Sequence, residues 1–257
     1  MKRLLATVVS VQPLTEGMGH LTVKLPDGAE KAQAGQFAHI SVPGDRRNLL
    51  RRPISIYSAH DGLLELAIAG KGEGTQRILA AQPGDTLDVL YPLGHGFEKK
   101  QHKRIAFVGG GIGVAPLRYA MEEYADENCT AIFGYRSKEL IYAVHECRAT
   151  GANVVVCTDD GSFGVHGLVT VPLREMLEEG ALDCIMACGP TPMLRAVQAL
   201  ALEFGVEAQL SLEEHMGCGI GACLTCNCKV KVKDGEFGYK RVCADGPVLD
   251  AKEVVFG

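Results

Sequence analysis

The sequence predicts an α+β protein of several domains, in which an antiparallel β-barrel precedes a Rossmann-like α/β domain and a small cysteine-bearing C-terminal segment. Three observations support this prediction. Short apolar runs separated by tight turns fill residues 1–98, strand-like and helix-like runs alternate over residues 101–210, and four spaced cysteines lie within residues 211–257. The chain has 257 residues, enough for two domains and an appendage.

The first region has the pattern of a small barrel. Its runs are apolar or alternating, and turn sequences such as Pro26-Asp27-Gly28 and Pro83-Gly84-Asp85 separate them. Short strands joined by tight turns favour an antiparallel barrel. We expect one helix over residues 74–81, and strands over residues 6–11, 21–25, 37–42, 54–58, 63–68 and 86–90.

The second region alternates strands with helices, which is typical of a parallel sheet with helices on both faces. We expect strands over residues 104–108, 130–135, 153–158, 184–187 and 206–210. Helices are expected over residues 114–124, 138–147, 173–179 and 191–204.

Four cysteines near the C-terminus carry the most specific chemistry of the chain. Cys218, Cys223 and Cys226 read C-x4-C-x2-C, and Cys243 follows further along. This spacing is typical of a plant-type [2Fe–2S] cluster, and the interleaved glycines let backbone N–H groups approach sulfur. Zinc and structural thiols are alternatives, although zinc ligands usually come as two close pairs. Cys228 is expected to pack beside the cluster rather than bind iron.

Two stretches at strand ends predict a nicotinamide nucleotide. The first follows the strand over residues 104–108, and its glycines let a pyrophosphate approach the backbone before a helix with proline in its first turn: Gly109, Gly110, Gly111, Gly113 and Pro116. The second, Cys188-Gly189-Pro190, has the same layout. Ligands bind at this carboxyl edge of open α/β sheets. An ordinary strand–helix turn is the alternative for both stretches.

Two stretches of the barrel region offer groups that bind phosphate. Arg52-Pro53-Ile54-Ser55 supplies a guanidinium fork for a phosphate and a hydroxyl for a ring or ribose. Gly74-Thr75 lies in a glycine-rich loop before the expected helix. The plain alternatives are a basic turn before an edge strand and a helix N-cap at Thr75.

Composition argues against several classes of protein. The chain has 26 basic and 31 acidic residues and a net charge of −5, which argues against a nucleic-acid binder. The basic group Arg46, Arg47, Arg51 and Arg52 is local, so it indicates a small anionic ligand. No apolar run reaches the length of a membrane span. We expect no signal peptide, and therefore a cytoplasmic protein with reduced thiols.

Together these motifs resemble the ferredoxin–NADP reductase superfamily. The motifs that carry the resemblance are Arg52-Pro53-Ile54-Ser55, Gly74-Thr75, residues 111–116 and Cys188-Gly189-Pro190. Residues 211–223 and 241–248 narrow it, because they closely resemble the electron-transfer subunits of type 1B, NAD-dependent dihydroorotate dehydrogenases. The similarity covers essentially the whole chain, and the cysteine-bearing segment is its most specific part.

The resemblance implies FAD in the barrel, a [2Fe–2S] cluster in the C-terminal segment and NAD as substrate. By matching positions, residues 52–55 and Gly74-Thr75 would bind the flavin and its pyrophosphate. Ile54 stands where many reductases place a tyrosine against the flavin, so apolar contact without aromatic stacking is expected. Backbone groups of three residues on the preceding strand would also contact the flavin: Ala67, Ile68 and Ala69.

The resemblance also implies a partner. In the family, an FMN-containing catalytic subunit oxidises dihydroorotate, and electrons then pass through the cluster and FAD to NAD+ in pyrimidine biosynthesis. A heterotetramer with two catalytic subunits is expected, and this chain is expected to have no dihydroorotate site of its own. A flavin exchanges electrons both in pairs and singly, so the order of carriers is coherent. Asp159 and Asp160 favour NAD, whereas Arg136 favours NADP.

Three other functions remain open. A related flavin–iron–sulfur subunit serves NAD(P)H:ferredoxin, hydrogenase or sulfur oxidoreductases, but an aspartate replaces one cluster cysteine in some of these, so four cysteines favour the dihydroorotate branch. A redox sensor without enzyme activity would not need the nicotinamide loop. A zinc-stabilised binding module would carry no flavin.

Overall fold

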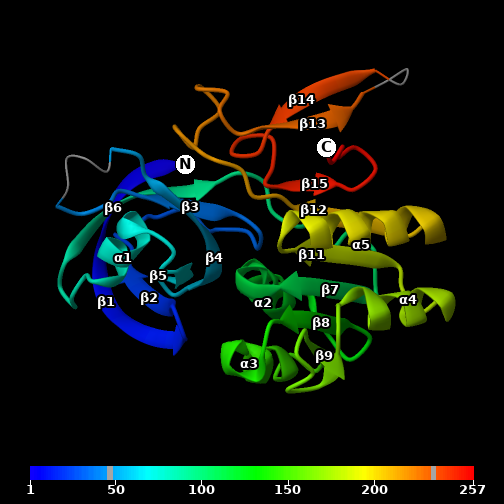
Figure 1. Cartoon of the computed structure of the whole chain (residues 1–257). Helices are drawn as coiled ribbons and strands as arrows, with labels where there is room; N and C mark the ends of the chain where they lie inside the picture. The colour runs from blue at the N-terminus through cyan, green and yellow to red at the C-terminus, as the bar shows by residue number, and fades with distance from the viewer. Residues whose placement is uncertain (45–48, 233–235) are drawn as a thin grey trace.

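The N-terminal strands close into an antiparallel barrel, drawn on the left of Figure 1. The computed structural model describes residues 1–44, 49–232 and 236–257. Around the barrel the strand order is β1-β2-β5-β4-β3-β6. The barrel strands, with the helix α1 (Glu73–Leu79) between the last two, are β1 (Lys2–Thr15), β2 (Met18–Lys24), β3 (Phe37–Ile40), β4 (Arg52–His60), β5 (Leu63–Ala69) and β6 (Thr86–Leu93).

All the predicted barrel strands are present, and pairing explains why β1 is longer than predicted. Its first half, residues 2–7, pairs with β6, and residues 7–15 pair with β2. One long strand therefore serves two neighbours, as a closed barrel requires. Along its first half, buried and exposed side chains alternate, because every second residue points into the barrel core.

The second sheet has the order β10-β9-β8-β7-β11-β12-β15. All its neighbouring strands are parallel except β12 and β15, which are antiparallel. Its strands are β7 (Ile105–Gly110), β8 (Thr130–Tyr135), β9 (Asn153–Thr158), β10 (Val165–His166), β11 (Cys184–Cys188), β12 (Glu207–Ser211) and β15 (Val248–Asp250). Because β15 comes from the C-terminal segment, that segment extends the nucleotide-type sheet, which the sequence did not predict.

The sheet separates two hydrophobic cores. Helices α2 (Val114–Tyr124) and α3 (Val144–Arg148) pack on one face, in a core that continues into the barrel. Helices α4 (Thr170–Glu178) and α5 (Thr191–Phe204) pack on the other face, in a core shared with the C-terminal segment. The hairpin of that segment, β13 (Asn227–Lys231) and β14 (Phe237–Arg241), lies above the sheet in Figure 1. None of the described helices combines the length and apolar character needed to cross a bilayer.

One predicted helix is wrong. The helix expected over residues 138–147 is a short 3-10 turn, η2 (Lys138–Leu140), followed by the separate helix α3. Ala143 precedes α3 with a φ of 62°, a left-handed conformation that an α-helix cannot contain. The Tyr142 hydroxyl donates to the Gly111 carbonyl at 3.1 Å, so this break carries a contact to the loop after β7.

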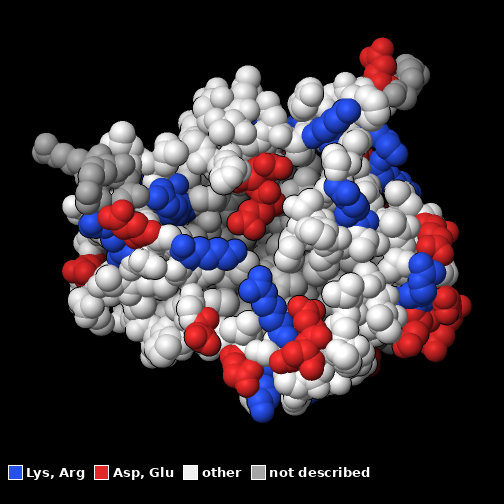
Figure 2. Space-filling view, viewed as in Figure 1, with Lys and Arg blue, Asp and Glu red and all other residues white. Residues whose placement is uncertain are grey.

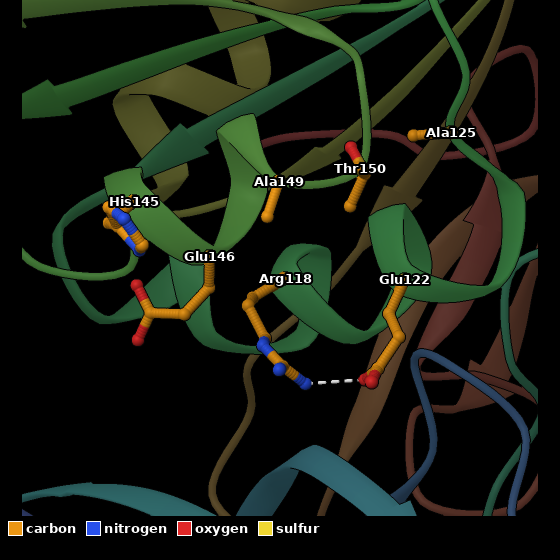
Figure 3. Close-up of a pocket in the computed structure, with 7 residues that line it drawn as sticks. All are labelled: Arg118, Glu122, Ala125, His145, Glu146, Ala149 and Thr150. Carbon is orange, nitrogen blue, oxygen red and sulfur yellow. Dashed lines mark hydrogen bonds and ion pairs between the residues drawn. The ribbon is translucent and has the colours of Figure 1, made fainter.

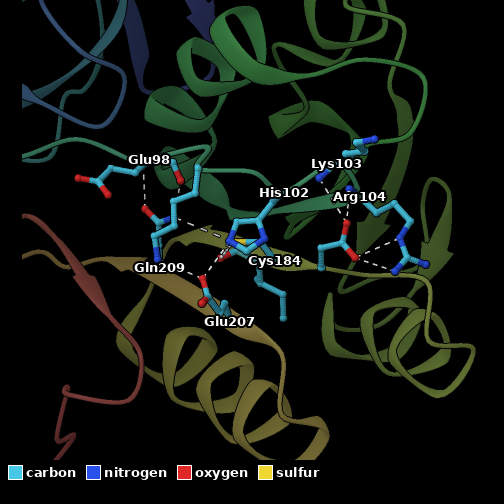
Figure 4. A network of polar contacts seen from close by, with 10 residues as sticks. Glu98, His102, Lys103, Arg104, Cys184, Glu207 and Gln209 are labelled. Carbon is cyan, nitrogen blue, oxygen red and sulfur yellow. Dashed lines mark hydrogen bonds and ion pairs between the residues drawn. The ribbon is translucent and has the colours of Figure 1, made fainter.

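The connection from barrel to sheet is tied to the amino ends of the parallel strands (Figure 4). The Glu98 N–H donates to Gln209 Oε1 at 2.9 Å, and Gln209 Nε2 donates to the Glu98 carbonyl at 2.7 Å. His102 Nε2 lies 2.9 Å from the Glu207 carboxylate. These contacts join residues 98–102 to β12 and help to orient the barrel against the sheet.

Candidate functional site

The residues predicted to bind FAD lie at the place where strands β4 and β5 stop pairing with each other. The ladder between these strands ends at the pair Ile56–Leu66. In the described part of the chain, residues 67–69 have no ladder partner on β4, and residues 52–55 pair with β3 alone. Backbone N–H and C=O groups need hydrogen-bond partners. The opening therefore fits a flat ligand with polar edges, such as a flavin ring.

The Arg52 side chain lies against the start of α1, beside this opening. A methyl group at Gly74 would meet Arg52 Nε and Nη2 at 2.5 Å, so glycine permits the approach. Gly72 is the N-cap, which shows that Thr75 is not. The Thr75 hydroxyl accepts from the Gly72 N–H at 3.3 Å. A guanidinium beside a helix N-terminus is a favourable place for a pyrophosphate.

Ile54 is 8% exposed and packs in the barrel core, so it offers a flavin ring only a small apolar edge. Pro53 and Ser55 are half-buried on the same strand. Arg46 and Arg47, grouped in the sequence with Arg51 and Arg52, lie outside the described residues.

The two stretches predicted to bind a nicotinamide nucleotide lie side by side. β7 and β11 are parallel neighbours with Gly109 opposite Cys188. A methyl group at Gly113 would lie 2.3 Å from the Cys188 carbonyl oxygen, and one at Gly189 would lie 3.1 Å from the Gly110 nitrogen. The chain runs from β7 outward in both directions along the sheet, so these loops flank a topological switch point, where nucleotides bind in such sheets.

Polar contacts join the barrel to the nucleotide-type sheet. The Tyr57 hydroxyl donates to Glu146 at 3.3 Å, and the Arg118 guanidinium lies 5.0 Å above the Tyr57 ring. Figure 3 shows Arg118 and Glu122, both on α2, directed toward each other. They line a hollow of about 470 Å³ between α2 and α3. None of the predicted site residues lines this hollow, so it is separate from both cofactor sites.

The predicted iron ligands form two pairs. The Cys218 N–H donates to Cys223 Sγ, and the Cys223 N–H donates to Cys218 Sγ, both at 3.4 Å. The Cys243 N–H donates to Cys226 Sγ at 3.4 Å. Among the described residues no group of three or more His, Cys, Asp or Glu could hold one metal ion. Two pairs fit a cluster of two irons with two cysteines each, better than a single four-coordinate zinc.

Backbone donors approach sulfurs of both pairs, whereas burial distinguishes them. Ala222 N–H lies 3.3 Å from Cys218 Sγ, and Gly221 N–H lies 3.1 Å from Cys243 Sγ. Hydrogen bonds, first from Thr225 and then from Cys218, lower the pKa of the exposed Cys223 thiol to about 6. Burial, with the neighbouring Cys226 sulfur, raises the pKa of Cys243 to about 12. Cys243 therefore favours the thiolate only when a metal is bound.

Arg241 and Asp245 connect the two cysteine loops, and sequence reasoning missed both. The Arg241 guanidinium donates to both Asp245 carboxylate oxygens at 2.8 Å and to the Gly221 carbonyl at 3.3 Å. Hydrogen bonds from Arg241 lower the pKa of the Asp245 carboxyl to about 2. The available signal was an arginine and an aspartate four residues apart around Cys243.

His39 was also missed. It is fully buried in β3, and neither ring nitrogen has a hydrogen-bond partner among the described residues. Burial lowers its pKa to about 4. The signal was a lone histidine inside the apolar run over residues 37–42. Cys228, by contrast, packs as expected, with its thiol donating to the Lys240 carbonyl at 3.4 Å.

The surface carries charges of both signs. Figure 2 shows acidic and basic side chains interleaved on the viewed face, with a hollow between the barrel and the sheet. No single-sign patch covers this face, which agrees with the net charge of −5 and with a small-molecule rather than a polymeric ligand.

Two family models match the chain. The iron–sulfur cluster binding domain of dihydroorotate dehydrogenase B matches residues 213–255. The oxidoreductase NAD-binding domain matches residues 107–199. These ranges contain the four spaced cysteines and both nucleotide loops. The predicted cofactors, an iron–sulfur cluster and NAD, are thereby confirmed.

Known proteins resemble the chain over nearly its whole length. The dihydroorotate dehydrogenase B (NAD(+)) electron transfer subunit of Caldanaerobacter subterraneus is 40% identical over 227 residues, 88% of this chain and 89% of the relative. That of Geobacillus thermodenitrificans is 40% identical over 258 residues, 97% of each chain.

Solved structures confirm the fold class. The NADH-dependent reduced ferredoxin–NADP oxidoreductase, studied for flavin-based electron bifurcation, superposes with a TM-score of 0.83 at 30% identity, over 98% of this chain and 90% of that one. The ferredoxin reductase of carbazole 1,9a-dioxygenase shares the fold at 22% identity and a TM-score of 0.66, over 80% and 66% of the two chains. With its paired cysteines, its nucleotide loops and these relatives, the chain belongs to the family of dihydroorotate dehydrogenase B (NAD(+)) electron transfer subunits.

Proposed function

We propose that this chain takes electrons from an FMN-containing catalytic subunit that oxidises dihydroorotate and delivers them to NAD+ through its [2Fe–2S] cluster and FAD. It is an NAD-linked flavin and iron–sulfur oxidoreductase subunit that serves pyrimidine biosynthesis. One observation carries the proposal: two cysteine pairs follow, in a single chain, a flavin-type barrel and an NAD-type sheet.

The proposed division of the chain is a flavin unit over residues 1–98, a nucleotide unit over residues 101–210 and a cluster segment over residues 211–257. The pairing of β15 with β12 couples the last two, so we expect them to unfold together.

The chain's own residues bind and orient the carriers. Residues 52–55, residues 67–69 and Gly74-Thr75 hold FAD at the opening between β4 and β5. The glycine loop after β7, with Pro116, and the loop of Cys188-Gly189-Pro190 hold the nucleotide at the switch point. Cys218, Cys223, Cys226 and Cys243 hold the cluster. FAD, when bound, supplies the exchange between paired and single electrons.

The test compares the purified chain with and without the catalytic subunit. Alone and anaerobically prepared, it should contain iron and acid-labile sulfide and oxidise NADH with ferricyanide, yet show no dihydroorotate turnover. Adding the catalytic subunit should produce dihydroorotate-dependent reduction of NAD+. Dihydroorotate turnover by the lone chain, or zinc in place of iron, would contradict the proposal.

Assembly and location follow from the same proposal. We expect a heterotetramer with two catalytic subunits, which sedimentation of the reconstituted complex would measure. We expect a cytoplasmic location, which agrees with ten cysteines of which none forms a disulfide.

A second candidate is a subunit that serves ferredoxin, because one relative of the same fold is an NADH-dependent reduced ferredoxin–NADP oxidoreductase. The two functions separate in one assay. If the second function is correct, reduced ferredoxin would donate electrons to the chain faster than the catalytic subunit that oxidises dihydroorotate. NADP+ would also replace NAD+, whereas we expect NAD+ to be preferred.

A further inference from the structure

His39 occupies an unusual position for a histidine. Its side chain is 0% exposed, and within the described residues neither Nδ1 nor Nε2 has a hydrogen-bond partner. An imidazole carries at least one N–H donor in either protonation state. Buried donors are nearly always paired in folded proteins. Backbone groups of Arg51 and Cys218 lie near the ring, but among the described residues the ring has at least one donor without a well-formed hydrogen bond.

The ring faces the loop that carries the first cluster ligand. A methyl group at Gly219 would lie 2.4 Å from His39 Nδ1, so the ring and the Gly219 backbone are in direct contact. Gly219 follows Cys218 in sequence and has a φ of +72°, which glycine adopts without strain. Both the conformation and the close approach therefore bring the Cys218 end of the cluster site to the histidine.

The same histidine is built into the flavin side of the molecule. β3 pairs with β4, with His39 opposite Pro53 and Phe37 opposite Ser55. The Phe37 ring packs edge-on to the imidazole, with 6.5 Å between the ring centroids. The imidazole thus lies between the strand that carries the proposed flavin residues and the loop that carries Cys218.

We propose that the His39 ring donates a hydrogen bond to a sulfur at the Cys218 end of the cluster and so makes the cluster easier to reduce. The inference rests on the iron–sulfur cluster of the proposed function. Sulfur in a cluster is anionic and becomes more so on reduction, so a donor stabilises the reduced form. His39 is then a positioning and tuning residue supplied by the barrel, not by the cluster segment.

The first test replaces the donor. His39→Phe keeps a planar ring and removes both nitrogens, whereas His39→Asn keeps an N–H donor near the place of Nδ1. In the full chain with FAD and cluster, His39→Phe should lower the equilibrium constant for cluster reduction about tenfold, or ~59 mV for one electron. His39→Asn should lie closer to wild type. The readout is an anaerobic redox titration followed by electron paramagnetic resonance.

Phe37→Leu provides the matched control. Phe37 is buried, lies on the same strand and packs beside the ring, but offers no donor. If His39 acts only through packing, Phe37→Leu and His39→Phe should shift the potential alike. An unchanged potential in His39→Phe would overturn the proposal, as would equal shifts in the two variants.

The second test can already be decided with the wild-type protein. The chain contains eight histidines, which can all be labelled with 15N. The reduced cluster of the labelled wild type should show a weak hyperfine coupling to one histidine nitrogen, which disappears in His39→Asn. Absence of that coupling in the wild type would overturn the proposed hydrogen bond from His39. Absence of iron and sulfide would instead sink the proposed function, so the two failures are distinct.

Discussion

The two cysteine pairs of the cluster segment come from one short stretch of chain but have different surroundings. Cys223 is exposed and Cys218 half-buried, whereas Cys226 and Cys243 are 1% and 2% exposed. Backbone N–H groups approach both pairs, but the pKa of Cys223 is lowered and that of Cys243 is raised. The inner pair lies in the core shared with α4 and α5.

This difference indicates that the two cysteine pairs have different roles in the cluster site. In the outer pair, hydrogen bonds from Thr225 and Cys218 favour the thiolate of Cys223, which helps this residue to bind metal at neutral pH. The inner pair is buried in the fold, and burial opposes the charge of Cys243. The inner pair therefore links cluster binding to the stability of the whole C-terminal segment.

The largest expected loss of stability comes from replacing a cysteine of the inner pair. A replacement in the outer pair provides the comparison. Cys243→Ser should abolish cluster binding and lower the free energy of unfolding by about 4 kcal/mol or more, because loss of a bound metal group in a core is among the costliest changes. Cys223→Ser should keep the segment folded and retain part of the iron. Iron and sulfide content with thermal unfolding measures both. Equal destabilisation by the two changes would remove the distinction between the pairs.

The loop inside the outer pair, between Cys218 and Cys223, should tolerate few substitutions. Gly221 has a φ of +82°, and a methyl group there would lie 2.8 Å from the Ala244 Cβ. Gly221→Ala should therefore lower the free energy of unfolding by about 2 kcal/mol and increase the rate of iron loss. Gly205→Ala is the control, since Gly205 has a similar φ of +68° with no atom within 4 Å. A control variant that loses as much stability and iron would show that backbone strain alone matters.

Breaking the Arg241–Asp245 pair with Asp245→Asn should lower the free energy of unfolding less than Gly221→Ala does, by about 1 kcal/mol. Asp245→Asn weakens the contacts that join both loops, so iron should leave faster. The folded-state pKa of Asp245 is about 2, below its unfolded value. Such a carboxyl contributes stability that is present above about pH 4 and is lost as the pH falls toward 2. The difference between wild type and variant in chelator-driven iron release should thus be constant from pH 5 to 8, and a slope there would contradict this.

The smallest effect is expected at Cys228. Its thiol is buried and donates to the Lys240 carbonyl instead of to one of the four ligand sulfurs. Cys228→Ala should cost about 1 kcal/mol in unfolding free energy and leave iron content and the spectrum of the cluster unchanged. Loss of iron in this variant would mean that Cys228 replaces one of the four ligands.

Local sequence signals were sufficient to predict the bounds of an element where its apolar periodicity was clear. The helices over residues 114–124 and 191–204 and the strands over residues 130–135 and 153–158 were predicted with the bounds that the structure has. In each, apolar periodicity and clear breakers agree. The helix over residues 138–147 failed because Tyr142 turns to reach the loop after β7, a contact with no local signature.

By itself the sequence determined the barrel followed by the α/β sheet, the four cysteines and the family, because spacing and periodicity are properties of the chain alone. Tertiary structure decided which groups meet. Three contacts join residues that are 20 to 180 positions apart. They are the pairing of β15 with β12, the hydrogen bond from Arg241 to the Gly221 carbonyl, and the contact of His39 with Gly219. Such contacts depend on how separate elements pack together, and no local pattern records that.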